Sequence, residues 1–274
     1  MMQLTYILAQ RTACRMAIAL ALLSAAGGWH GLPLAPSLVA AQSVSDLISA
    51  GDRESVARRP SVALALYERA VKADPTQYAA LWKASREAVD LGEFEPHVPT
   101  RTALYARAED YAKRAVAANA NDAEGHFHLS RAIGRTALAA SARDRVKYAV
   151  NVRDAALRAL ALNTKHPGAL HVLGVWNAEV MRLNGVARAF AKAFMGGQAL
   201  SSASWEEAIR YMEQAVAVEP NRLVHRLDLA RVYRDAERRN DARAAYQAAL
   251  RAPLQDANDD RYRQSASEEL AKLR

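Results

Sequence analysis

The sequence predicts an all-α solenoid, in which antiparallel helix pairs stack into a right-handed superhelix. Alanine, the residue with the highest helix propensity, is abundant, whereas the 274 residues include only 12 Gly and 9 Pro. Small and large residues alternate with a period of 34, which is typical of stacked helix pairs. Four positions show this period, pairing Ala208 with Ala242, Met212 with Tyr246, Ala215 with Ala249 and Pro220 with Leu254.

The N-terminal residues 1–41 predict a secretory signal peptide. Arg11 and Arg15 precede a short apolar run over residues 16–26, and small residues follow it up to Ala41. A basic flank, a short apolar core and small residues at a cleavage site are the three parts of such a leader. We expect cleavage after Ala41 and export across the inner membrane, to the periplasm or beyond. An uncleaved membrane anchor is the alternative.

Cysteine usage and charge limit the chemistry of the mature chain. The only cysteine, Cys14, lies in the leader, so residues 42–274 contain no thiol nucleophile and no thiolate metal ligand. The formal net charge of +8 is a modest basic excess. It favours an anionic partner such as an acidic peptide or a phospholipid head group.

The first two helix pairs follow the leader. A short helix is expected over residues 44–50, and the segment around Tyr67 carries the pattern of the second helix of a pair. The next helix is expected over 76–91, where Gly92 should end it. Helix should resume near Arg101, after a loop with two prolines.

Three further pairs and a capping helix complete the expected domain over residues 42–274, with about five pairs in all. A long helix is expected over 141–162, and the pair that begins at Pro167 is interrupted by an insertion over 182–204. Its second helix should begin near Trp205. The last helix, near 261–273, should cover the exposed end of the stack.

Three stretches carry a resemblance to a known family: GHFHLSRAIG, HPGALHVLGVWNAEV and SWEEAIRYMEQAVAVEPN. Together with the insertion, they resemble the tetratricopeptide (TPR) region of the regulator of microtubule dynamics family, over roughly residues 76–273. The resemblance implies a TPR fold without enzymatic motifs, in a family associated with microtubules and organelle membranes. Because a bacterial-type leader precedes the repeats, we transfer the fold and do not expect microtubules as a partner.

A ligand groove is predicted from the inward-facing positions of the first helix of each pair. Bulky residues at the fifth position lie one turn before arginines at the ninth, so both share one helix face. Arginine binds carboxylate or phosphate through two parallel hydrogen bonds, which suits a ligand with an anionic end and an apolar body. The candidate groove residues are Trp82, Arg86, Phe127, Arg131, Arg135, His171, Leu227, Arg231 and Arg234.

Two structural alternatives stand beside this groove. The arginines could instead pair with Asp90, Glu87, Glu124 or Asp235 on a solvated face. Within the insertion, Phe190 and Phe194 lie on an apolar stripe, which predicts a lid over the groove, a membrane-surface contact or a plug between helices.

The leading functional hypothesis is an exported scaffold that binds an anionic peptide or protein segment in its groove. A phospholipid-binding or lipid-transfer protein that uses the same groove is the alternative. An enzyme is the third hypothesis. It ranks last because the usual catalytic motifs are absent from the sequence. We expect no nucleic-acid partner and no cofactor. A metal site is not expected either, because His126 and His128 are two residues apart and point to different helix faces.

Overall fold

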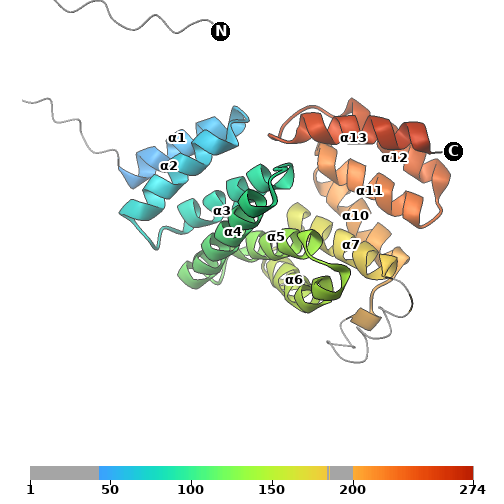
Figure 1. Ribbon diagram of the computed structural model, residues 1–274, viewed down its shortest axis with the longest axis horizontal. Helices are drawn as coiled ribbons and strands as arrows, with labels where there is room; N and C mark the ends of the chain where they lie inside the picture. The colour runs from blue at the N-terminus through green and yellow to red at the C-terminus, as the bar shows by residue number, and fades with distance from the viewer. Residues whose placement is uncertain (1–42, 184, 186–199, 274) are drawn as a thin grey trace, which may run out of the picture. The chain divides into compact units, whose positions relative to one another are not determined.

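The computed structural model describes residues 43–183, 185 and 200–273 (Figure 1). In these ranges the chain is helical and contains no strand, and no helix is both long enough and apolar enough to cross a membrane. The helices are α1 (Val44–Val56), α2 (Pro60–Ala73), α3 (Tyr78–Glu93), α4 (Val98–Ala118), α5 (Ala123–Ala139), α6 (Ala142–Leu162), α7 (Pro167–Arg182), α10 (Trp205–Val218), α11 (Leu223–Asp235), α12 (Arg239–Arg251) and α13 (Asp259–Lys272).

The helices pack as pairs, α1 with α2, α3 with α4, α5 with α6, α7 with α10 and α11 with α12, and α13 covers α11 and α12 (Figure 1). The predicted all-α solenoid is confirmed. Tyr67 on α2 and Tyr246 on α12 are fully buried between alanines that are themselves fully buried. The alternation of small and large residues therefore marks the positions where one helix meets the next.

Some helix boundaries differ from the predicted ones. Helix α1 continues to Val56 instead of ending at residue 50. Helix α4 begins at Val98, three residues before Arg101, because Pro99 lies in its first turn, where its missing N–H costs no hydrogen bond. The leader (1–41) and the two insertion phenylalanines, Phe190 and Phe194, lie outside the described residues.

The predicted role of Gly92 as a helix terminator is wrong. Helix α3 runs through Gly92 to Glu93, and a Cβ atom at residue 92 would lie 2.5 Å from the ring of Tyr105 on α4. The glycine is needed for the close approach of two paired helices. Gly92→Ala is therefore expected to lower the free energy of unfolding by about 2 kcal/mol, because the rigid ring must shift. Urea denaturation measures this loss.

Gly134 on α5 provides the matched control. A Cβ atom at this position would meet no atom closer than the Val152 side chain at 3.9 Å, an ordinary contact. Gly134→Ala should stabilise the protein by up to about 1 kcal/mol through its higher helix propensity. Equal effects of the two substitutions would contradict the packing role of Gly92.

The last helix does more than cover the C-terminal end of the stack. The ring of Tyr262 on α13 meets Phe94, just after α3, edge-on, with centroids 5.5 Å apart. The Asn258 side chain donates to the Asp90 carbonyl at 2.9 Å, and Arg58 pairs with Asp260 at 3.1 Å. The C-terminal cap thus contacts the first two pairs, although 168 residues separate Asn258 from Asp90.

Candidate functional site

A cavity of about 610 Å³ lies among the first helices of four pairs, α3, α5, α7 and α11. Tyr262 on α13 and Asn258 before it complete its wall, so the contacts of the C-terminal cap with the α3 pair also bound this space. The volume falls in the range of small-molecule and peptide-end pockets.

Seven of the nine predicted groove residues line this cavity: Trp82, Arg86, Phe127, Arg131, Arg135, His171 and Arg231. The other two do not. Leu227 is fully buried in the hydrophobic core, and the neighbouring Asp228 takes its place on the cavity wall. Arg234 contacts Asp235, Glu269 and the hydroxyl of Tyr246, outside the cavity.

One face of α5 supplies the polar side of the cavity. Residues seven and eleven positions apart on an α-helix lie on one face, so Glu124, Arg131 and Arg135 form a row. All three line the cavity, together with Phe127 and His128. Glu124 lies in the first turn of α5, and Arg135 lies near its last turn.

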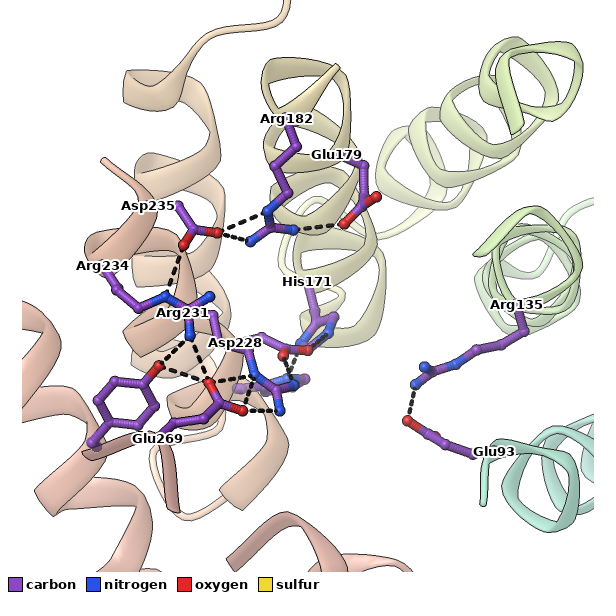
Figure 2. Close-up of polar contacts among 12 residues, drawn as sticks. Glu93, Arg135, His171, Glu179, Arg182, Asp228, Arg231, Arg234, Asp235 and Glu269 are labelled. Atoms are coloured by element: carbon purple, nitrogen blue, oxygen red, sulfur yellow. Dashed lines mark hydrogen bonds and ion pairs between the residues drawn. The ribbon is translucent and has the colours of Figure 1, made fainter. Parts of the chain in front are cut away.

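Arg131 and Arg135 each meet one carboxylate from α3. Arg131 donates to Asp90 at 2.5 Å. Arg135 forms an ion pair with Glu93 at 2.6 Å (Figure 2). In the described part of the chain neither guanidinium group has another hydrogen bond or ion pair. Because a guanidinium group carries five N–H donors, both arginines keep donors for a ligand.

Arg231 and Arg182, by contrast, use their donors within the protein (Figure 2). Arg231 contacts Glu269 on α13 at 2.5 Å and Asp228 at 2.9 Å. Arg182, at the end of α7, contacts Glu179 at 2.6 Å and Asp235 on α11 at 2.5 Å. These arginines join helices to one another. Of the partners considered in the structural alternative, Asp90 meets Arg131, Glu87 meets Arg86 and Asp235 meets Arg234.

Arg86 also has a structural partner. It pairs with the buried Glu87 at 2.8 Å and donates to the Ser55 hydroxyl of α1 at 2.9 Å. Burial raises the pKa of Glu87, and the charge of Arg86 opposes this shift. Arg86 therefore lines the cavity while it ties α3 to α1.

A histidine pair connects α7 to α11. The Nδ1 atoms of His171 and His225 lie 2.6 Å apart, so one ring donates and the other accepts. The outer nitrogens face Asp228 and Glu219, each at 3.1 Å. Burial lowers the pKa of His225 to about 4, although Glu219 favours its charged form. Burial alone would raise the pKa of Asp228, but His171 and Arg231 hold it well below its ordinary value.

A second group surrounds Glu124. Its two carboxylate oxygens lie 3.4 Å from Nε2 of His128 and 3.4 Å from Nε2 of His166. His128 stacks on Trp82 with centroids 5.2 Å apart, and burial lowers its pKa to about 4. Burial would raise the pKa of Glu124, yet its bonds to the two histidines lower it strongly. No group of three or more potential ligands among the described residues could hold a metal ion.

The remaining wall is apolar. Val152 on α6 and three residues of α7, Val172, Val175 and Trp176, face the cavity together with Leu200. The indole N–H of Trp176 donates to the Ala149 carbonyl at 2.7 Å, which fixes the ring against α6. An apolar body can therefore lie between this wall and the polar face of α5.

Several cavity residues were not predicted from the sequence. His166 and Glu219 lie in loops that precede first helices, and Tyr262 lies on the capping helix. The groove was predicted from positions within the first helix of each pair, and none of these three residues lies in such a helix.

The sequence matches the family model described as regulator of microtubule dynamics protein 1-3 over residues 42–274. The chain belongs to this family. It is 25% identical to regulator of microtubule dynamics protein 1 of Mus musculus over 142 residues, which are 52% of this chain and 46% of that protein. The Bos taurus protein of the same name is also 25% identical, over 44% of its length. The chain thus matches less than half the length of these relatives.

A solved structure supports the fold independently. The chain resembles TTC0263, a thermophilic TPR protein of Thermus thermophilus, with a TM-score of 0.57 and 23% identity. The likeness covers 82% of this chain and 100% of that one. The helix pairs of this member of the regulator family are therefore TPR-like repeats, as predicted.

Proposed function

We propose that this chain is an exported, non-enzymatic binding protein that holds an anionic segment of a partner polypeptide in the cavity. The spare N–H donors of Arg131 and Arg135, beside an apolar wall, carry this proposal. A partner carboxylate can join both guanidinium groups while Asp90 and Glu93 keep them in position. Hydrogen bonds between charged groups are the strong ones, and the Arg131 and Arg135 side chains expose only 19% and 24% of their surface.

The apolar part of the segment would lie against Phe127, Val172 and Trp176, opposite the arginines. Ligand pockets commonly have apolar walls that provide affinity and a few polar groups that fix the orientation of the ligand, and this cavity has both. The stacking of TPR-like repeats around a shared hollow suits a binding role.

Replacing both arginines tests the proposal. The double variant Arg131→Gln, Arg135→Gln should retain at least about tenfold less partner protein than the wild type in a pull-down from cell-envelope extract, because the partner's anionic group loses its donors. Circular dichroism checks that the variant is folded.

The exposed arginines Arg107 and Arg210, on α4 and α10, provide the control. The double variant Arg107→Gln, Arg210→Gln removes the same charge and should keep the wild-type partners. Equal retention by both double variants would contradict a role of the cavity arginines.

Phospholipid binding is the second candidate, favoured by the apolar wall of α6 and α7. An acyl chain would lie against Val152 and Val175, and the phosphate would meet Arg131 and Arg135. Organic extraction of the purified protein followed by mass spectrometry should then yield phospholipid from the wild type and none from the Arg131→Gln, Arg135→Gln variant. If the wild-type protein yields no phospholipid, the phospholipid candidate fails and the polypeptide ligand remains.

Export is tested separately. If residues 1–41 are a cleaved leader, N-terminal sequencing of the protein from its native cells should begin near Gln42. A start at Met1 contradicts cleavage. Only a start near Gln42 would imply that the partner is periplasmic or secreted.

A further inference from the structure

We propose that the end of the cavity between Glu124 and Glu219 binds an ammonium group of the ligand. This inference rests on the proposed function, because it concerns the opposite end of the same ligand. The site lies at the first turn of α5 and in the loop before α11. Both carboxylates line the cavity.

The distribution of arginine partners singles out these two carboxylates. Seven carboxylates line the cavity. Five of them meet an arginine within 3 Å: Asp90 with Arg131, Glu93 with Arg135, Glu179 with Arg182, Asp228 with Arg231 and Asp256 with Arg222. Among the described residues, Glu124 and Glu219 pair only with histidines.

Neither His128 nor His225 neutralises the carboxylate beside it. His128 beside Glu124 and His225 beside Glu219 both have a pKa of about 4, because burial disfavours the imidazolium. Both rings are therefore neutral at pH 7. The Glu124 and Glu219 side chains expose 41% and 42% of their surface, so a ligand can reach them. Among the described residues neither carboxylate forms an ion pair with arginine or lysine, although Arg222, which pairs with Asp256, lies close enough to Glu219 to lower its pKa.

An unpaired buried acceptor lies at the same end. His128 lines the cavity and is 98% buried (2% exposed), and its Nδ1 atom has no hydrogen-bond partner in the part of the chain that the structure describes. When Nε2–H faces the Glu124 carboxylate, Nδ1 of the neutral ring is an acceptor. An ammonium group carries only donors, so it complements this nitrogen as well as the two carboxylates.

The spacing along α5 sets the length of the ligand. Glu124 lies about 10 Å from Arg131 and about 16 Å from Arg135 along the helix axis, at 1.5 Å per residue. An extended tetrapeptide spans about 14 Å. The geometry thus suits a short peptide, or the end of a chain, whose ammonium group meets Glu124 while its carboxylate meets the two arginines.

Equilibrium dialysis of the full chain against a mixture of tetrapeptides Ala-X-X-Ala, where X is Val, Leu or Phe, tests the inference. The peptides are compared with free ends, with an acetylated N-terminus and with an amidated C-terminus. Acetylation should weaken retention at least about tenfold, because it removes the ammonium group. N-acetylated peptides that begin with Lys separate the two sources of an ammonium group: recovery of retention assigns the site to a lysine side chain, and no recovery assigns it to a chain N-terminus.

Two variants locate the effect. In Glu124→Gln, free and acetylated peptides should be retained within about twofold of each other, and Glu219→Gln provides a second reading if that variant does not fold. Glu109→Gln, on α4 and not among the cavity residues, removes the same charge and should keep the wild-type preference. Equal retention of free and acetylated peptides by the wild type, or no retention of any peptide, overturns the ammonium site. If acetylation weakens retention but amidation does not, the ammonium site stands and the proposed role of Arg131 and Arg135 fails.

Discussion

Tyr262→Ala is expected to lower the free energy of unfolding by about 3–5 kcal/mol, the range for loss of a buried aromatic ring. Tyr262 exposes only 6% of its surface, although it lies on the last helix of the stack. Its ring packs edge-on against Phe94 after α3 and lines the cavity. Without the ring, a hole remains between the cap and the α3 pair. Urea denaturation measures the loss.

The position of the stability loss is as informative as its size. In a repeat protein each unit usually contacts only its neighbours, so damage to a terminal helix stays local. Here Tyr262 and Asn258 contact residues of the second pair. Amide hydrogen exchange should therefore become faster in α3 as well as in α13 of the Tyr262→Ala protein.

Tyr262→Phe separates the ring from its hydroxyl. The ring is kept, so stability should fall by no more than about 1 kcal/mol. If Tyr262→Ala costs less than Tyr262→Phe, or if only α13 exchanges faster, the cap does not stabilise the α3 pair and the prediction is wrong.

Local pattern predicted the helices and their pairing. Alanines flank Tyr67 and Tyr246 at fixed spacing, and both tyrosines are fully buried in the structure. A helix face is defined by residues three or four apart, so a sequence displays it directly. Gly92 shows the limit of this reasoning. Glycine commonly ends a helix, but at residue 92 it is required inside the helix because the ring of Tyr105, from another helix, lies against it.

The partners in the cavity depend on how the pairs stack. Arg131 meets Asp90 across 41 residues, and His171 meets His225 across 54 residues and an insertion. These contacts are fixed by the angle and translation between neighbouring pairs, which the repeat pattern does not encode. The sequence therefore indicated four of the five arginines correctly, since Arg86, Arg131, Arg135 and Arg231 line the cavity and Arg234 does not. It could not distinguish Arg131, with spare donors, from Arg231, whose donors are used by Glu269 and Asp228.

Acidification from pH 7 to pH 5 is expected to lower the free energy of unfolding by a net amount of about 3 kcal/mol. The main contribution comes from His128 and His225, whose pKa values burial lowers to about 4, whereas an unfolded histidine titrates near 6.5. Below pH 6.5 the unfolded chain therefore binds protons that the folded chain does not. At pH 5 each histidine has cost about 2 kcal/mol, and the loss is complete near pH 4.

Asp256 acts in the opposite direction. Burial raises its pKa to about 6, and Arg222, at 2.8 Å, opposes this shift. Between pH 6 and pH 4 the folded chain therefore binds a proton that the unfolded chain does not, which offsets about 1 kcal/mol of the loss at pH 5. Glu124 and Asp228, whose pKa values are lowered, lose their stabilising effect only at more acidic pH. The histidines consequently determine the sign of the slope between pH 7 and pH 5.

Substitution of the histidines isolates their contribution. Urea denaturation at intervals between pH 7 and pH 5 should give a shallower dependence of stability on pH for His128→Gln. The double variant His128→Gln, His225→Gln should reverse the slope, since Asp256 and Glu87, whose pKa values burial raises, then provide the remaining proton uptake of the folded chain. The absolute stability of these variants is not the test, because each also loses contacts with Glu124 or Glu219. A wild-type protein whose stability is flat over this range, or a double variant with the wild-type slope, would show that these two rings are not held neutral by burial.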